Sequence, residues 1–430
     1  MQKVSALDQG LKSAARAIRR WWQTGLLLWE QPPGGLLLAF ACYTTLALIN
    51  GPLAFSSSVP HYNYLADAFL HGQLHLRLLP PGKYDLVFFQ GHYYLYWPPM
   101  PAIVLMPFVA VFGIGFSDIL FTVGVASLNV ALVALLLRQA CRRQLFRLSR
   151  LQRAWLVLFF ALGTVHVTLA PFGKVWFTGQ TTGFAWVALA YLAALSLKGE
   201  GAFFLTGFGL AGALLTRTHL IFVGLWPAYY LLREHWTAPR KRLIFGIALG
   251  LFPVVLAVAG MAAYNWRRFG NPADVGLDYH LMADYHLMAP VFLEAYQKYG
   301  AFNLHYLPIN VFYQYLAYPF PFSSKSWLGG SLFLLSPVFF AALWALYTGR
   351  RRPDVWVLAA TIMCVNVPIL LLMGTGWVQF GPRYTLDFTV PLLFLAAIGL
   401  RRWPLGVLGL LVLISILHYL TGTAMIIRVN

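Results

Sequence analysis

Long apolar runs constrain this chain more than any other feature. Residues 34–55 and 243–264 contain no charged residue, and each is long enough to cross a bilayer, which needs about 20 apolar residues in helical form. Only 10% of the chain is charged and 60% is hydrophobic, whereas a soluble domain carries roughly 25% charged residues. The sequence therefore predicts an all-α polytopic membrane protein with about 11 transmembrane helices. The apolar segments centre on residues 34–55, 119–137, 154–171, 182–197, 202–216, 219–232, 243–264, 328–347, 355–374, 386–400 and 404–424.

The basic residues predict how these spans are oriented. With eleven spans and a cytoplasmic N-terminus, 21 of the 31 lysines and arginines fall on the cytoplasmic side, as the positive-inside rule requires. Within residues 1–33, Leu11, Ala15, Ile18 and Trp22 share one helical face beside basic side chains. That pattern is typical of an interfacial helix, and the apolar run after it is longer than the core of a cleavable signal peptide. We expect a multi-pass protein of the inner (cytoplasmic) membrane with its N-terminus in the cytoplasm.

A twelfth apolar stretch, residues 98–116, does not fit this count. Treating it as a span would move the six arginines of residues 138–153 to the outside. Its four prolines and two glycines favour a half-inserted or interfacial helix, because broken helices are tolerated only where protein or a cavity covers the freed backbone groups. Two long outer loops then remain, residues 56–118 with juxtamembrane helices and residues 265–325, and the whole chain forms one domain, residues 1–430.

The titratable residues gather on the predicted outer face. Eight of the thirteen acidic residues and eight of the eleven histidines map there, and loops held by a rigid scaffold commonly carry function. The formal charge of +18 is explained by membrane orientation, and no nucleic-acid-binding module is present. The three cysteines show no CxxC spacing, so neither a disulfide framework nor a thiolate metal site is expected.

The first outer loop contains two groups of candidate residues. Residues 61–76 have helical periodicity, which places Asp67, His71 and His75 on one face, and a carboxylate beside an imidazole can act as a base or orient one. The alternative is an amphipathic helix that lies on the membrane with its polar face in water.

The second group follows in YDLVFFQGHYYL, residues 84–95. Asp85 precedes a β-prone stretch and Gln90–Gly91 is typical of a hairpin turn, which would bring Tyr93, Tyr94 and Tyr96 near Asp85. Aromatic rings beside a carboxylate suit a sugar, whose faces are apolar and whose edges are hydroxyls. The alternative for the tyrosines is an aromatic belt at the membrane interface.

Three arginines lie at the outer ends of predicted spans: Arg217, Arg267 and Arg383. Charges near the bilayer are costly and usually have partners or a function, and a guanidinium binds phosphate through paired hydrogen bonds. We therefore expect these residues to hold a lipid phosphate. For Arg383 the alternative is an ion pair with Asp387, four residues further on, that only fixes a helix end.

A hexapeptide, DYHLMA, occurs twice, at residues 278–283 and 284–289. Asp-x-His in two copies could supply oxygen and nitrogen ligands to a metal, but a tandem duplication on a polar surface is the more common explanation, so no metal residue is assigned. The chain contains no GxxxxGK[ST], no HExxH and no Asp-x-Asp. A cytosolic nucleotide sugar is therefore not the expected donor if a sugar is transferred.

Taken with these motifs, the layout resembles the GT-C superfamily of membrane glycosyltransferases, near glycosyltransferase family 39, the protein mannosyltransferase and aminoarabinose transferase group. The resemblance rests on the basic N-terminus, one span and a long outer loop reading YLADAFLHGQLHLRLLP and DLVFFQGHYYLYWPPMPAIVLMPFVAVFG, and on YNWRRFGNP and FGPRYTLDFTVPLL later in the chain. It implies a polyprenyl-phosphate sugar as donor and an acidic residue of the first outer loop that deprotonates or orients the acceptor. Some members use a divalent metal, so the resemblance leaves metal dependence open.

Two departures from the family pattern shape the site prediction. The family acid usually follows the first span at once, but residues 55–58 contain none, so Asp85 is the first candidate for the base and Asp67 the second. The lysine before the double proline is Trp97 here.

We expect Arg383, Arg217 and Arg267 to bind the donor phosphate, and Tyr93, Tyr94, Trp97 and His61 to line the sugar and acceptor site. The expected function is inverting transfer of a sugar, on the extracytoplasmic face, to a hydroxyl of an envelope glycan, lipid or protein. A lipid or solute transporter and a non-catalytic membrane scaffold are the alternatives, and nucleic acid is not an expected partner.

Overall fold

The computed structural model describes residues 23–279, 290–374 and 379–429. Residues 1–22 of the predicted interfacial segment and the second copy of the hexapeptide lie outside these residues. Most of the described chain is helical, which confirms the predicted all-α polytopic class. Seven helical segments are long and apolar enough to cross a membrane within the described residues, so the count of eleven spans stays a prediction. These segments are α2 (Pro32–Asn50), α5 (Asp118–Arg142), α6 with α7 (Arg150–Leu162, His166–Leu169), α11 (Arg240–Phe269), α16 (Pro353–Leu371), η8 with α17 and η9 (Arg383–Phe388, Thr389–Gly399, Leu400–Arg402) and α18 (Leu405–Val429).

The remaining predicted spans are helical as well, but shorter, less apolar or interrupted. They form α8 (Val175–Ser196), α9 (Gly199–Leu214), η1 (Thr218–Gly224) with α10 (Leu225–Glu234), and the broken run α14 (Leu332–Leu335), η7 (Pro337–Phe339) and α15 (Phe340–Thr348). The second outer loop contains η2 (Leu277–Tyr279), α12 (Pro290–Tyr299), η4 (Leu304–Tyr306), α13 (Leu307–Val311), the π-helical η5 (Phe312–Leu316) and η6 (Ser324–Trp327). Two short strands, β3 (Leu328–Gly329) and β4 (Gln379–Phe380), pair in parallel.

The loops predicted to be cytoplasmic meet at one end of the helix bundle. The Arg352 guanidinium donates to the Leu145 carbonyl at 2.9 Å, and the Gln152 amide donates to the Leu400 carbonyl at 3.4 Å. These bonds join three segments that are far apart in the sequence: residues 145–152, the loop at Arg352 and Leu400 at the start of η9. This grouping fits an arrangement in which these loops share one side of a membrane, and which side is cytoplasmic stays a prediction.

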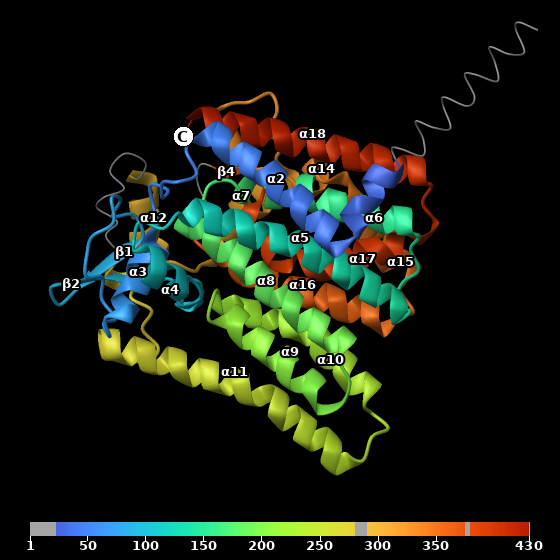
Figure 1. The fold of residues 1–430 in the computed structure, drawn as a ribbon, viewed down its shortest axis with the longest axis horizontal. Helices are drawn as coiled ribbons and strands as arrows, with labels where there is room; N and C mark the ends of the chain where they lie inside the picture. The colour runs from blue at the N-terminus through green and yellow to red at the C-terminus, as the bar shows by residue number, and fades with distance from the viewer. Residues whose placement is uncertain (1–22, 280–289, 375–378, 430) are drawn as a thin grey trace, which may run out of the picture.

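The segments predicted to be outside gather at the opposite end (Figure 1). They comprise α3 (His61–Leu70), the antiparallel strands β1 (Leu86–Phe89) and β2 (His92–Leu95), and α4 (Met100–Phe112). The Met100 amide donates to the Leu215 carbonyl at 2.9 Å, and the Arg268 guanidinium donates to the Leu95 carbonyl at 2.8 Å. These two bonds attach the first outer loop to the ends of α9 and α11.

The predicted hairpin is confirmed. Leu86 pairs with Leu95 and Phe89 with His92, and the two turn residues Gln90 and Gly91 have φ of 48° and 82°, as a two-residue hairpin turn demands. Residues 98–116 form only the 13-residue helix α4, which is too short to span a bilayer alone. This length agrees with the interfacial interpretation.

The predicted helix over residues 61–76 is wrong in its extent. Helix α3 ends at Leu70, and Gly72 takes a φ of 71°, a left-handed conformation that terminates helices. His75 therefore does not share a helical face with Asp67. Instead its ring stacks on His92 at a centroid distance of 4.1 Å.

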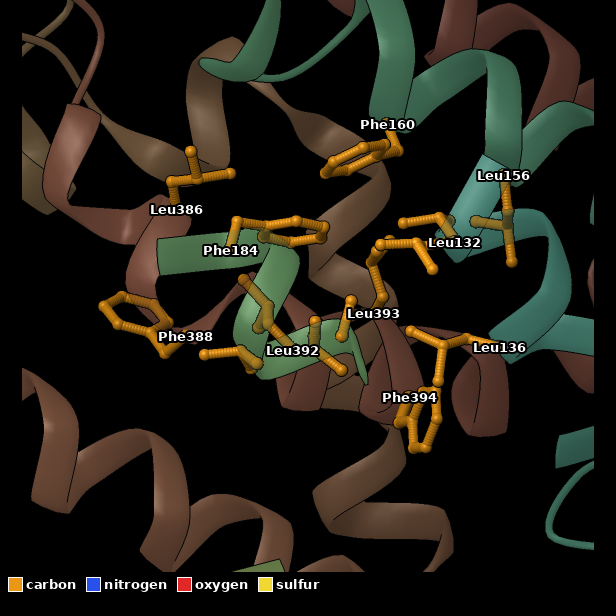
Figure 2. Packing of buried hydrophobic residues seen from close by; sticks show 14 of the residues in the cluster. Leu132, Leu136, Leu156, Phe160, Phe184, Leu386, Phe388, Leu392, Leu393 and Phe394 are labelled. Atoms are coloured by element: carbon orange, nitrogen blue, oxygen red, sulfur yellow. The ribbon is translucent and has the colours of Figure 1, made fainter. Parts of the chain in front are cut away.

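The main core includes buried aliphatic and aromatic side chains of α5, α6, α8 and α17. Figure 2 shows Leu386 and Phe388 beside Phe184 of α8. Leu386 and Phe388 flank Asp387 and are both 1% exposed. Because close-packed interiors resist displacement, this packing fixes the short segment η8, which contributes charged residues to the site described next.

Candidate functional site

The first two turns of α8 form one wall of a polar cluster. The Trp176 indole donates to the Asp85 carboxylate, and the Gln180 side-chain amide donates to the Arg383 carbonyl at 3.1 Å. The Arg383 guanidinium carbon lies 5.9 Å from the centre of the Phe177 ring. Residues separated by three or four positions on a helix share a face, so α8 brings Asp85 of the outer loop and Arg383 of η8 to the same side of the helix.

The start of α8 is fixed by its neighbours. The Val175 amide donates to the Val59 carbonyl at 3.1 Å, and a Cβ at Gly173 would overlap the backbone of Ile119. Gly173 has a φ of 62°, a conformation open to glycine. Burial lowers the pKa of Lys174, the residue that precedes the helix.

Asp85, the first candidate for the base, is buried, with 7% of its surface exposed. The Tyr96 hydroxyl donates to its carboxylate at 3.3 Å, on the side opposite the bond from Trp176 to the other oxygen. Its φ of 59° is uncommon for a residue with a side chain, and such strain is often found at functional sites. The outer loop therefore presents an oriented carboxylate inside the protein.

The two predicted sugar-lining tyrosines contact different aromatic rings. Tyr94 packs on Phe269 at a ring distance of 5.4 Å, and Tyr93 packs on Phe88 at 4.9 Å. Successive residues of a strand point to opposite faces, so the hairpin cannot direct both rings to one site. Trp97 does reach the cluster, with its ring 5.8 Å from the Arg217 guanidinium carbon.

Asp67, the second candidate for the base, has a different environment. Its carboxylate pairs with Arg77 at 3.3 Å and lies 3.5 Å from His71. These partners are exposed, and the contacts described for Asp67 include none of the site arginines. Asp67 and Asp85 are therefore not brought together.

Arg217 and His219 share one buried carboxylate. Asp387 is 1% exposed at its side chain, and its Oδ2 lies 3.1 Å from the Arg217 guanidinium and 2.8 Å from His219 Nε2. Arg217 itself is 4% exposed. The predicted alternative, an ion pair between Arg383 and Asp387, does not form in this structure.

The reason is the local helix type. Residues 383–388 form the 3-10 helix η8, in which side chains three apart eclipse and those four apart diverge. Arg383 is instead held by aromatic rings and has no carboxylate partner within the described residues. The Tyr384 ring centre lies 4.9 Å from the Arg383 guanidinium carbon and 5.0 Å from that of Arg217, so one ring contacts both arginines.

The third predicted arginine is not part of this cluster. Arg267 is exposed near the end of α11, whereas its neighbour Arg268 is buried and donates to Leu95 and, at 2.7 Å, to Asn265. Arg268 thus anchors the hairpin to α11. The sequence motif contained both arginines and did not distinguish their roles.

Several buried polar atoms of the cluster have no hydrogen-bond partner among the described residues. Such atoms are rare in proteins and call for an explanation such as a bound polar ligand or water. Here they come from α3, the loop after β2, α8, the end of α9 and η8. They are His61 Nδ1, Tyr62 Oη, Trp97 Nε1, Gln180 Oε1, Arg217 Nε and Arg383 Nε.

Tyr62 and His61 are two buried polar residues of α3 that belong to the cluster. Burial raises the pKa of the Tyr62 hydroxyl, and the charges of Arg217 and Asp85 also act on it, in opposite directions. His61 Nε2 donates to the Tyr84 carbonyl at 2.6 Å, and burial lowers the pKa of its imidazole. A neutral His61 then presents Nδ1 as an acceptor.

Within the described ranges, no three histidine, cysteine, aspartate or glutamate side chains come close enough to hold a metal ion. Most of the tandem repeat lies outside those ranges, so the structure does not test metal dependence.

Sequence reasoning missed Tyr62, Trp176, Gln180, His219 and Tyr384 as members of the cluster. The one signal available was the polar start of the apolar segment that became α8, where a tryptophan and a glutamine precede a long apolar run.

No family model matches the chain, and no curated protein matches it either. Among solved structures, ArnT from Cupriavidus metallidurans in the apo state matches with a TM-score of 0.51 at 15% identity, covering 86% of this chain and 60% of ArnT. The Archaeoglobus fulgidus oligosaccharyltransferase in its apo form matches with a TM-score of 0.49 at 13% identity, covering 96% of this chain and 56% of that one. The undecaprenyl phosphate complex of the same ArnT gives 0.42 at 15% identity, covering 86% and 61%.

The chain thus spans about 60% of the length of the ArnT structure it matches. The likeness shows that the chain shares the fold of ArnT over the part that it matches.

Proposed function

We propose that this chain is a membrane glycosyltransferase that moves a sugar from a polyprenyl-phosphate donor to an acceptor hydroxyl on the extracytoplasmic face of the inner membrane. The fold it shares with ArnT, the apolar helices and the polar cluster at the outer end of the bundle support this proposal. The acceptor would be a hydroxyl of an envelope glycan, lipid or protein.

The observation that carries the proposal is the charge balance of the two buried arginines. Arg217 and Arg383 flank one tyrosine ring, yet of these two arginines only Arg217 pairs with Asp387. Both Nε–H groups are buried without an acceptor among the described residues. A buried, uncompensated cation is costly. A phosphate, which guanidinium groups bind through paired hydrogen bonds, would compensate the charge of Arg383 and accept hydrogen bonds from both arginines.

In the proposed reaction, Asp85 accepts the proton of the acceptor hydroxyl while that oxygen attacks the anomeric carbon of the sugar. The bond between this carbon and the phosphate oxygen breaks, and the phosphate leaves with the electron pair. Arg217 and Arg383 stabilise the charge that develops on it, as fixed donors do in other transfer reactions. A single displacement of this kind inverts the configuration at the anomeric carbon.

The aromatic rings of Trp97 and Tyr384 would contact the sugar and orient it. The unpartnered Nδ1 of His61 and hydroxyl of Tyr62 would bind its hydroxyl groups, because a buried acceptor and a buried donor each require a partner.

The test is transfer in proteoliposomes that contain radiolabelled polyprenyl-phosphate sugars and a membrane extract as acceptor. We expect Asp85→Asn to reduce transfer by roughly 10²–10⁴-fold, the usual contribution of a general base, with undecaprenyl phosphate binding retained. Asp67→Asn is the matched control, because Asp67 carries the same group in a partly exposed ion pair, and it should change transfer by less than about threefold.

Each outcome bears on the proposal. Full activity of Asp85→Asn together with loss in Asp67→Asn would assign the base to Asp67. If the wild type neither turns over nor binds any donor across several sugars, the chain is not a transferase. Movement of the lipid across the bilayer without transfer would identify a transporter instead.

A further inference from the structure

The pair formed by His219 and Asp387 is not used by the reaction described above. His219 lies in η1, two residues after Arg217, and its Nε2 is 2.8 Å from Asp387 Oδ2. The Asp387 side chain is almost fully buried, whereas 19% of the His219 side chain is exposed. The histidine is therefore fixed at one edge of its ring and accessible elsewhere.

The shared carboxylate oxygen determines which nitrogen of His219 carries a proton. Asp387 Oδ2 also accepts from Arg217, and an arginine side chain can only donate hydrogen bonds. An ionised carboxylate only accepts hydrogen bonds, so Nε2 must be the protonated nitrogen. Nδ1 is then the nitrogen that the pair with Asp387 leaves available, and it forms no hydrogen bond with any residue that the structure describes.

A proton on His219 changes the net charge of the group of side chains around it. With a neutral imidazole, the group of Arg217, Asp387 and His219 has no net charge, and with a protonated imidazole its net charge is +1. Arg383 and Tyr384 of η8 approach the same group through the ring that Arg217 contacts. The helices α8, α9, α10 and α16, which also pack against η1, bring no charged side chain to the His219 ring among the described contacts.

The leaving phosphate of the proposed reaction can take up a proton, and a histidine can supply one. When the bond to the sugar breaks, the polyprenyl phosphate becomes a monoester, whose second pKa is about 6. Arginine cannot deliver a proton, because its guanidinium stays protonated in proteins. Histidine exchanges a proton near neutral pH, and a carboxylate that fixes the other nitrogen is a familiar way of orienting it.

We propose, on the basis of the function proposed above, that His219 is the proton donor to the leaving phosphate. In this step the N–H bond at Nδ1 of the imidazolium breaks and an O–H bond forms on the departing phosphate oxygen, while Asp85 holds the proton taken from the acceptor. Asp387 is a positioning residue that fixes Nε2. Exchange with solvent returns the proton to His219 and removes the one on Asp85 after the products leave.

The experiment compares two donors that carry the same sugar, undecaprenyl phosphate sugar and undecaprenyl pyrophosphate sugar, over a range of pH. The pyrophosphate is the better leaving group and needs less protonation. With the monophosphate donor we expect His219→Gln to lower kcat by roughly 10²-fold, the lower end of acid–base contributions, with little change in KM. The decline of wild-type kcat at alkaline pH should disappear in this variant.

With the pyrophosphate donor, the loss in His219→Gln should be much smaller and the alkaline decline of the wild type should be weaker. His305→Gln is the matched control, because His305 is an exposed histidine in the second outer loop that stacks on Tyr299 at 3.8 Å. It should keep wild-type kcat and the wild-type pH profile.

The failures are distinguishable. A wild type that transfers sugar while His219→Gln keeps its kcat and alkaline decline overturns the role of His219 and leaves the proposed function intact. A rise in KM with unchanged kcat likewise overturns proton donation. A wild type inactive with every donor overturns both. If His219→Gln does not fold, the wild type alone decides, because equal alkaline declines with the two donors contradict the proposal.

Discussion

Replacing Arg383 by glutamine separates a binding role from a structural one. The Arg383 guanidinium is buried, contacts Phe177 and Tyr384 and has no carboxylate partner within the described residues. A hydrogen bond to a charged group contributes about 1.5–3 kcal/mol, and each 1.4 kcal/mol is a factor of ten. We therefore expect Arg383→Gln to weaken binding of undecaprenyl phosphate by roughly 10- to 150-fold.

The same substitution should leave the stability of the empty protein unchanged or raise it. An uncompensated buried charge does not stabilise the fold, because its desolvation is not repaid by a partner. Arg217→Gln is the opposite case at the same site, since it leaves the buried Asp387 without its arginine. Breaking a buried ion pair from one side costs about 3–5 kcal/mol, so this variant should melt markedly earlier.

The assay is thermal unfolding of the detergent-purified protein with and without increasing undecaprenyl phosphate, because a ligand that binds only the native state raises the midpoint. Arg267→Gln is the matched control. Because Arg267 is exposed, we expect this variant to change neither the unfolding midpoint nor the binding of undecaprenyl phosphate. An Arg383→Gln protein that melts several degrees earlier and binds undecaprenyl phosphate as well as the wild type would refute the reasoning, because Arg383 would then be a structural residue.

Two further predictions concern packing and pH. A Cβ at Gly207 of α9 would overlap the Gly250 carbonyl of α11, whereas nothing lies within 4 Å of one at Gly201. In thermal unfolding, Gly207→Ala should therefore destabilise the protein by about 1–3 kcal/mol, and the control Gly201→Ala should not. Equal unfolding midpoints for the two variants would contradict this contact between α9 and α11. Burial holds the pKa of His61 below its ordinary value of 6.5, so its contribution to stability is present above pH 6.5 and lost as the pH falls toward the lower folded-state pKa. The unfolding midpoint should therefore decline on acidification below pH 6.5 more steeply in the wild type than in His61→Gln, and parallel pH profiles would exclude His61 as the cause.

The sequence predicts the layout of the fold because its strongest signals are local. Apolar runs identify the helices, and the pair Gln90–Gly91 identifies the hairpin, since few residues accept the positive φ values that its turn requires. The extent of α3 was predicted too long, because the periodicity of residues 61–76 continues past Gly72 while the backbone does not. In residues 61–76, the spacing of apolar residues alone does not show that the helix ends at Leu70.

The site is less accessible to sequence reasoning, because its pairs join distant segments. Arg217 and Asp387 are 170 positions apart, and the nearer acid–base spacing, Arg383 to Asp387, suggested an ion pair that the 3-10 geometry of η8 prevents. Asp85 was identified because it precedes the hairpin, but its partner Trp176 lies 91 positions away. The sequence therefore predicts which residue types can do the chemistry, and only the packing of α8 shows which of them meet.

The two site arginines differ in how the protein holds them, and this difference assigns them different tasks. Arg217 is neutralised by Asp387 and cannot move without breaking a buried ion pair, so it gives the cluster a fixed geometry. Among the residues that the structure describes, the Arg383 guanidinium contacts the Phe177 and Tyr384 rings and donates to the Tyr384 hydroxyl at 3.4 Å. No carboxylate there neutralises it, so its charge is left for a ligand. A fold that keeps such a charge away from water accepts a cost in stability that an anionic ligand removes on binding. It follows that the ligand-dependent rise in the unfolding midpoint should depend on Arg383 more than on any other residue of the cluster.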